Sequence, residues 1–233
     1  MLPGDIKYLD NPAWHSLSLA HVALSSGDRR ARRYQPDVSP MAGIDNDSNL
    51  SELSDIFEPG ETTMLIFPTS RQMPKHPDWR ELDRIPIYQM VCVETNSDDA
   101  ALPGQLLIES DEPDMLKLAR DTEPGPFEIQ TRRFGDYYGV RDASNRLVAM
   151  AGERLRMPGW IEVSGVCTHS SARGQGLASA LVKQVMQPIF AANCSAFLHV
   201  REGSTSGKSA IAVYERLGFR YHQAMTANVI ERL

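Results

Sequence analysis

The sequence has 233 residues, of which 42% are hydrophobic and 23% are charged, and its formal net charge is −6 at pH 7. Such a composition is ordinary for a globular protein of one large or two small domains, and the acidic balance argues against a nucleic-acid-binding protein, which is usually basic. The three cysteines are scattered, and their odd number argues against a disulfide framework. No apolar leader and no apolar run of about 18 residues is visible, so we expect a cytoplasmic protein that does not enter a membrane.

The first hundred residues contain no pattern of catalytic residues. Residues 14–24 fit a helix or a strand, because their apolar positions match both periods. The basic cluster Arg29–Arg33 stands alone in an acidic chain and is interpreted as a solvated turn that pairs with nearby acids. The other expected elements are a helix that starts at Asn49 with a capping-box pattern and ends before Pro59, strands over 62–67 and 85–93, and loops over 34–48 and 68–84.

The stretch 95–104 is polar and ends in Pro-Gly, which is typical of a linker. It divides the chain into an expected N-terminal α+β lobe over residues 1–100 and a larger domain over residues 105–233.

In the second half, short strands joined by turns predict an antiparallel meander. The expected elements are strands over 105–110, 137–142, 146–155 and 160–168, helices opening at Asp111 and Gly174, a strand over 196–200, a helix that carries Tyr214, and two last strands over 219–230. Pro188 should end or kink its helix, and Gly218 suits a left-handed residue after a helix. A strand, a helix and a further strand in succession require a parallel pair with a crossover, so the sheet should be mixed.

The stretch Glu162–Val182 organises this half. A strand leads into Arg173-Gly-Gln-Gly176, and Leu177, Leu181 and Val185 then recur on one helical face. A helix N-terminus leaves backbone N–H groups unpaired and carries partial positive charge, so it attracts anions, and glycines there let a phosphate approach the backbone.

Three segments resemble motifs of the GNAT N-acetyltransferases. Arg173–Ala178 matches the [Gln/Arg]-x-x-Gly-x-[Gly/Ala] loop that holds the pyrophosphate of acetyl-CoA in that family. Glu162–His169 looks like the family's fourth strand, and Ala210–Phe219 is similar to its Ala-x-x-Leu-Tyr-x-x-x-Gly-Phe helix. The resemblance covers roughly residues 105–233. It implies an α/β (α+β) GNAT fold, with a mixed, mostly antiparallel twisted sheet flanked by helices and a smaller α+β N-terminal lobe. A degenerate GNAT-like repeat is an alternative for that lobe.

The resemblance also implies roles for individual residues. Tyr214 would be the general acid toward the CoA sulfur, and Glu162 the general base, directly or through water. His169 and His199 are alternative proton acceptors. No metal is implied. The acetyl-CoA site would comprise the strand residues Val166, Cys167 and Thr168 and the loop and helix residues Arg173, Gly174, Gln175, Gly176, Leu177, Ala178 and Ser179.

Other residues are given structural interpretations. Cys167 is interpreted as a small apolar filler, because no histidine–acid pair accompanies it. Glu123 and Phe127 could face substrate, but a surface acid and a core aromatic are the preferred interpretations. Gly203–Ser209 resembles a nucleotide-binding P-loop, but it has three residues between its glycines where that motif needs four.

The expected function is N-acetyl transfer from acetyl-CoA to a primary amine of a small molecule or peptide, by direct attack in a ternary complex. The alternative is a non-catalytic acyl-CoA-binding sensor. The implied partners are acetyl-CoA and an amine acceptor, without nucleic acid or membrane, and a homodimer is one candidate assembly.

Overall fold

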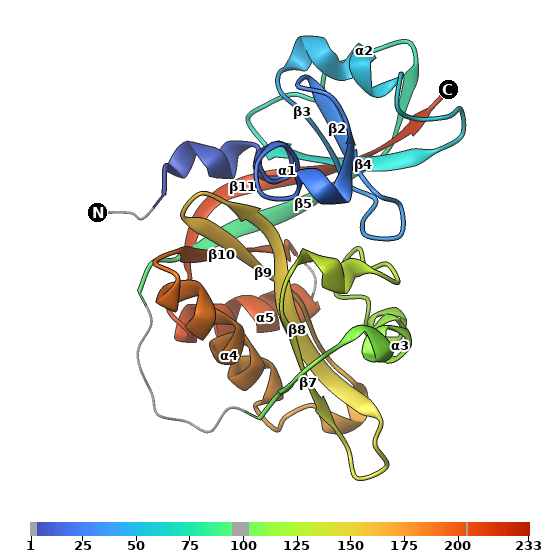
Figure 1. Ribbon diagram of the computed structural model, residues 1–233. Helices are drawn as coiled ribbons and strands as arrows, with labels where there is room; N and C mark the ends of the chain where they lie inside the picture. The colour runs from blue at the N-terminus through green and yellow to red at the C-terminus, as the bar shows by residue number, and fades with distance from the viewer. Residues whose placement is uncertain (1–3, 95–102, 204) are drawn as a thin grey trace.

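The computed structural model describes residues 4–94, 103–203 and 205–233, and within them the chain forms an eight-stranded sheet and a separate three-stranded sheet (Figure 1). The helices are α1 (Pro12–Ser18), α2 (Leu50–Leu53), α3 (Glu112–Thr122), α4 (Leu177–Ala191) and α5 (Thr205–Arg216). The strands are β1 (Ser25–Gly27), β2 (Ala31–Tyr34), β3 (Ala42–Ile44), β4 (Thr62–Pro68), β5 (Trp79–Cys92), β6 (Gln105–Leu106), β7 (Tyr137–Arg141), β8 (Leu147–Met157), β9 (Trp160–Thr168), β10 (Ser195–Arg201) and β11 (Arg220–Arg232).

The large sheet has the strand order β4-β11-β5-β10-β9-β8-β7-β6. Its pairings are antiparallel except for that between β9 and β10, which are parallel and joined by the crossover helix α4. This arrangement confirms the predicted mixed, mostly antiparallel sheet, and it also confirms the parallel pair that the strand–helix–strand order requires.

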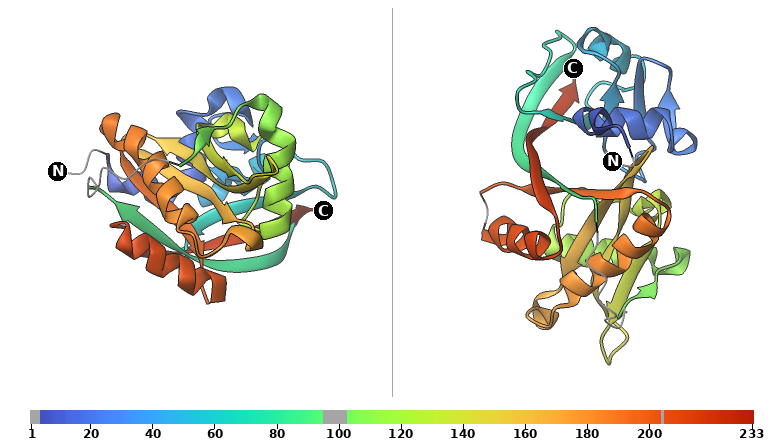
Figure 2. Two further views of the ribbon diagram at one scale, coloured as in Figure 1. Left: turned by 90° about the horizontal axis from the view of Figure 1, so that it is seen from below. Right: turned by 90° about the vertical axis from the view of Figure 1, so that its left-hand side faces the viewer.

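Helices cover both faces of the large sheet (Figures 1 and 2). Apolar residues of α4 and α5 pack with residues of β8, β9 and β10 in one buried cluster, which includes Leu181, Val185 and Tyr214. On the α3 side, Met115 and Leu118 pack with Tyr137, Met150 and other residues of the meander. The two helical layers therefore hold β9 between them, and that strand carries the predicted site residues Glu162, Val166, Cys167 and Thr168.

The two halves of the chain share the large sheet. β5 lies between β10 and β11, and β4 forms the outer edge beyond β11. A second buried cluster joins Leu9, Leu17 and Tyr34 of the first half to Leu155 and Phe197 of the second. The expected linker falls largely on residues 95–102, outside the described residues, and the division into two domains stays a prediction.

Several expectations for the first half need correction. Residues 14–24 begin in α1, which settles the helix-or-strand alternative for Trp14–Ser18. The side chain of Asn49 makes no cap hydrogen bond, and α2 ends at Leu53, well before Pro59. The expected loop over 68–84 ends early, because β5 begins at Trp79 and pairs with the last residues of β11. The expected loop over 34–48 likewise contains β3.

The basic cluster pairs with acids as expected, although part of it is strand β2 and not a turn. Arg30 lies 2.7 Å from Glu52, and Arg33 lies 2.8 Å from Glu61. The guanidinium of Arg33 also stacks on the ring of Phe57, 3.8 Å from its centre. These contacts assign the cluster to the packing of the N-terminal half.

In the second half, three predicted boundaries are wrong. Residues 220–232 form one long strand, β11, instead of two, because no Gly or Pro interrupts them and β5 pairs along nearly the whole length. Helix α4 continues through Pro188 to Ala191. Only Gln105 and Leu106 of the expected strand over 105–110 pair with β7. Gly218, by contrast, has φ 96° after α5, and the Phe219 N–H donates to the Tyr214 carbonyl, as expected of a helix C-cap.

Candidate functional site

The site lies where β9 and β10 separate. The two parallel strands pair only over Trp160–Glu162 and Ser195–Phe197. Beyond these pairs, β9 follows β8 to Thr168, while β10 follows β5 to Arg201. The strands therefore form a V that opens toward their carboxyl ends, with β8 outside one arm and β5 outside the other.

The β9 arm of the V offers a backbone donor that faces inward. The His169 N–H donates to the Val148 carbonyl of β8 at 2.8 Å. Because backbone groups alternate in direction along a regular strand, the N–H group of Thr168 points away from β8, into the V. A register shift at Gly165 and Val166 interrupts the β8–β9 ladder directly before this point. The Thr168 hydroxyl is buried and has no hydrogen-bond partner within the described chain. The inner edge of this arm can therefore hold a ligand that carries a carbonyl.

The glycine loop follows directly at the N-terminus of α4. Gly174 and Gly176 have φ 78° and 76°, and a Cβ on either would meet no atom within 4 Å. The first intrahelical bond runs from the Ala180 N–H to the Gly176 carbonyl at 3.1 Å, so the amides of Leu177, Ala178 and Ser179 precede it. Residues 173–176 are exposed. The glycines face open space, which is the geometry that a backbone cradle for phosphates needs.

Two further residues of the loop region lie beside this cradle. The Arg173 Nε donates to the Thr168 carbonyl at 3.3 Å, so its guanidinium stays between the β9 arm and the loop. The ring of His169, one of the alternative proton acceptors, caps the short turn that follows β9, because its Nδ1 accepts from the Ser171 amide at 3.2 Å.

Tyr214 of α5 is nearly buried, with 8% of its surface exposed. Burial, with a smaller contribution from the nearby Cys167 thiol, raises the pKa of Tyr214 to about 12, so the phenol stays protonated at neutral pH. Its ring packs edge-on against Phe219, and its hydroxyl makes no hydrogen bond within the described residues. Cys167 itself is 6% exposed, and burial raises the pKa of its thiol to about 11, which keeps it an unreactive thiol.

Glu162, the predicted general base, lies at the closed end of the V and is fully buried. Both of its oxygens accept hydrogen bonds from Arg154, at 2.6 and 2.8 Å, and His199 Nδ1 lies 2.7 Å from Oε1. Burial alone would raise the pKa of this carboxyl, but Arg154 and His199 reverse the effect and lower it to about 2. A carboxylate held in this way is a weak proton acceptor at neutral pH, because an effective general base has a pKa near the working pH.

His199, the other alternative acceptor, is part of the same buried network. Its Nε2 lies 3.1 Å from the Nε2 of Gln89 on β5, and that amide also donates to the Leu9 carbonyl at 3.0 Å. Gln223 of β11 in turn donates to Gln89 at 3.0 Å. The network therefore connects the closed end of the V to strands and segments of both halves of the chain.

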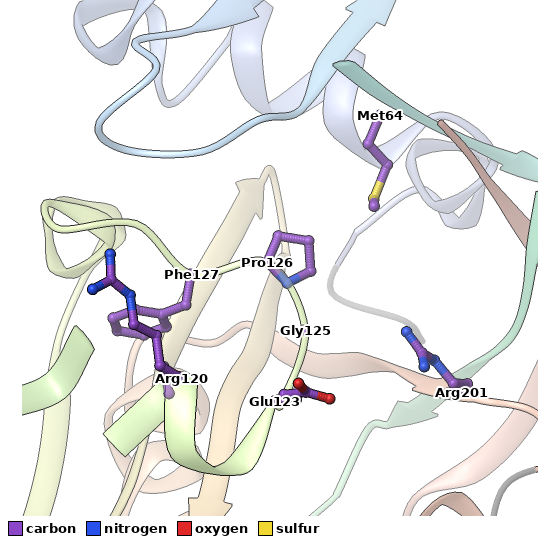
Figure 3. Close-up of a pocket in the computed structure, with 8 residues that line it drawn as sticks. Met64, Arg120, Glu123, Gly125, Pro126, Phe127 and Arg201 are labelled. Atoms are coloured by element: carbon purple, nitrogen blue, oxygen red, sulfur yellow. The ribbon is translucent and has the colours of Figure 1, made fainter. Parts of the chain in front are cut away.

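A cavity of about 450 Å³ adjoins the V, between the end of α3 and its following loop on one side and β4 and β10 on the other (Figure 3). Its lining includes Glu123, Phe127 and Arg201. Sequence reasoning preferred structural roles for Glu123 and Phe127 and did not consider Arg201. The available signal was the position of Glu123 and Phe127 in the connection that directly follows α3, because binding residues are often found on loops next to a rigid element.

The comparison with solved structures decides the family. A crystal structure of a protein from Novosphingobium aromaticivorans, assigned to the GNAT family of acetyltransferases, is 35% identical to this chain, covers 97% of it and 98% of its own length, and superposes with a TM-score of 0.88. The chain belongs to the GNAT family. The sequence resemblance on the glycine loop and the Tyr214 helix is thereby confirmed.

Other comparisons agree with the GNAT fold. The family described as FR47-like protein matches residues 137–227, which run from β7 into β11. A GCN5-related N-acetyltransferase from Kribbella flavida shares the fold at 16% identity, with a TM-score of 0.59, over 94% of this chain and 95% of its own. An acetyltransferase of the GNAT family from Colwellia psychrerythraea does so at 11% identity, with a TM-score of 0.53, over 94% and 89%. No match was found among curated proteins.

Two other kinds of site are not found in the described part of this GNAT chain. No three His, Cys, Asp or Glu side chains in residues 4–94, 103–203 and 205–233 converge to hold a metal ion. None of the helices in those ranges has the length and apolar character to cross a membrane.

Proposed function

We propose that this GNAT protein is an acyltransferase that moves an acetyl group from acetyl-CoA to a primary amine of a small molecule or peptide, by direct attack in a ternary complex formed in the cytoplasm. The observation that carries the proposal is the V between β9 and β10, which has the Thr168 N–H facing inward on one arm and an open glycine cradle at its end. A thioester chain that lies in the V would have its carbonyl against the β9 arm while its pyrophosphate lies on the N-terminus of α4.

Each chemical need of the reaction has a candidate group in this chain. The amides of Val166 and Thr168 would polarise the thioester carbonyl, since donors aimed at a developing oxyanion stabilise it. A C–N bond forms as the C–S bond breaks, and the Tyr214 hydroxyl would give its proton to the departing thiolate. The pKa of about 12 keeps that proton available at neutral pH. The gain from such a general acid is typically about 10²–10⁴-fold.

We assign Glu162 a positioning role within this proposal. Its charge is neutralised by Arg154, and it contacts His199 at the closed end of the V, so it fixes the two strands where they part. An ammonium would first lose a proton to solvent, because Glu162 is a weak acceptor at neutral pH. The proton that the nitrogen gives up as the C–N bond forms would then restore the Tyr214 hydroxyl.

The test is a titration with acetyl-CoA followed by an assay for free CoA thiol over a panel of primary amines. We expect saturable binding of acetyl-CoA and thiol release that depends on the amine. The competing candidate, an acyl-CoA sensor that keeps the glycine loop without turnover, predicts binding and no thiol release with any amine. That second outcome would refute the proposed function.

A further inference from the structure

The cavity beside the V is lined by three exposed charged residues whose side chains make no ion pair or hydrogen bond within the described residues: Arg120 and Glu123 from the α3 end, and Arg201 from the end of β10 (Figure 3). Unpaired charges of opposite sign on facing walls of one cavity are complementary to a ligand that carries both signs.

The backbone at Glu123 supports a role for its side chain. Glu123 has φ 49°, in the left-handed region that favours glycine. The other non-glycine residues with positive φ in the described chain are Asn145 and Asn193, a residue type that tolerates this conformation. Glutamate has no such tolerance, and glycine is the usual residue at a helix end of this shape. The helix end thus keeps a carboxylate at the cavity wall at some cost in backbone strain.

The cavity lies over the open mouth of the V. Arg201 ends the β10 arm, and the end of α3 packs on the β9 arm, because Leu118 and Ala119 share a buried cluster with Cys167 and Ala119 also lines the cavity. A ligand between Glu123 and Arg201 would therefore lie next to the place proposed for the thioester carbonyl. This is where an acceptor must bind for direct attack.

The remaining lining limits the size and polarity of the ligand. Phe127, Pro126 and Met64 supply apolar surface to the same cavity. The volume of about 450 Å³ is in the lower part of the range of small-molecule sites, about 300–1,000 Å³. A small molecule with an apolar portion suits this space better than a folded protein or a long peptide.

We propose that the acceptor is a small amino acid-like molecule whose ammonium is bound by Glu123, whose carboxylate is bound by Arg201, and whose apolar side chain lies against Phe127 and Met64. Arginine suits the second role because its planar guanidinium pairs with a carboxylate through two parallel hydrogen bonds. The two arginines also disfavour polyamines, because a second ammonium would lie beside a positive charge. This inference rests on the proposed acetyl transfer and names the substrate class of the same site.

The test compares matched acceptors on the full chain at saturating acetyl-CoA. L-phenylalanine, L-methionine and L-leucine are each paired with the amine that remains after removal of the carboxylate. We expect kcat/KM for the best amino acid to exceed that of its decarboxylated partner by about 10–100-fold, the usual effect of one charge-assisted pair. Arg201→Gln should remove this preference through KM and leave the decarboxylated amine unaffected. Glu123→Gln should lower kcat/KM for both.

Arg84→Gln is the matched control. Arg84 is an exposed arginine on β5 with no side-chain ion pair in the described chain, so its loss changes the net charge equally without touching the cavity. Calorimetry of amino acid binding to the CoA-saturated protein gives a readout independent of turnover, and Arg201→Gln should weaken that binding by the same factor.

Equal kcat/KM values for amino acids and their decarboxylated amines would overturn the inference. If thiol is still released in that case, the proposed function is unaffected. Loss of acetyl-CoA affinity in Arg201→Gln would also overturn it, because the arginine would then belong to the donor. Acetyl-CoA binding without thiol release from any amine would refute the proposed function, and this inference with it.

Discussion

Replacing Glu162 with glutamine tests the buried ion pair at the closed end of the V. The change keeps the shape of the side chain and removes the charge that faces Arg154, which is 8% exposed. The pKa of the Glu162 carboxyl falls from 4.5 to about 2 on folding. Since one pKa unit corresponds to 1.36 kcal/mol, this difference of about 2.5 units contributes roughly 3 kcal/mol to stability at neutral pH. Breaking a buried pair by removal of one partner usually costs about 3–5 kcal/mol, so the two figures agree.

The sign of the pH dependence follows from the lowered pKa. The contribution of Glu162 is complete above its unfolded pKa of 4.5 and is lost as the pH falls through about 2. Urea unfolding followed by tryptophan fluorescence should therefore show Glu162→Gln to be about 3 kcal/mol less stable than the parent at pH 7. The difference should shrink as the pH falls from 4.5 to 2.

Glu58→Gln is the control for this measurement, because Glu58 is exposed and its side chain makes no ion pair in the described chain. A Glu162→Gln variant as stable as this control at pH 7 would refute the argument. So would a stability difference that stays constant down to pH 2.

Three further predictions concern the V and the cavity. Tyr214→Phe should lower kcat by about 10²-fold or more with acetyl-CoA affinity unchanged in calorimetry, and normal turnover would remove the hydroxyl from the mechanism. Gly176→Ala adds a Cβ at φ 76° and should weaken acetyl-CoA binding, whereas Gly60→Ala, at φ 87° and equally open, should cost a similar amount of stability, about 1 kcal/mol, and leave binding intact. If both alanine variants bound acetyl-CoA alike, the cradle would lie elsewhere. Glu123→Gly should raise the free energy of unfolding by up to about 1 kcal/mol, by relief of the strain at φ 49°, while kcat/KM for the acceptor falls. A less stable variant with normal kinetics would contradict both halves of that prediction.

Local signals explain what the sequence predicted well. The order β9, glycine loop and α4 could be predicted because it depends on residues that are neighbours in the chain. The apolar periodicity indicates the strand and the helix, and the two glycines mark a backbone conformation that other residues rarely adopt. Gly218 was predictable for the same reason. The family resemblance used these segments, and the comparison with the Novosphingobium aromaticivorans structure confirms it.

Contacts between residues far apart in the sequence explain the features that the sequence analysis did not predict. Residues 80–84 are five exposed residues in succession, so this stretch was predicted as loop, and only its pairing with β11 makes it strand. Pro188 is tolerated in α4 within a helix whose apolar face is firmly buried. Glu162 was predicted as the general base, and its buried ion pair was not predicted. Its partner Arg154 lies across the β8–β9 hairpin, and a register drawn through the Pro158-Gly159 turn could have brought the two together.

The position of β5 limits how the chain can be truncated or combined with segments of a relative. β5 pairs with six residues of β10, twice as many as β9 does, and so it sets the direction of the diverging arm of the V. A fragment that began at residue 105 would lack this neighbour and would expose one edge of β10 and both edges of β11. The direction of the β10 arm, and with it the shape of the proposed donor site, thus depends on the N-terminal half. A chimera that takes this half from a relative would change that arm and also the β4 wall of the cavity proposed for the acceptor.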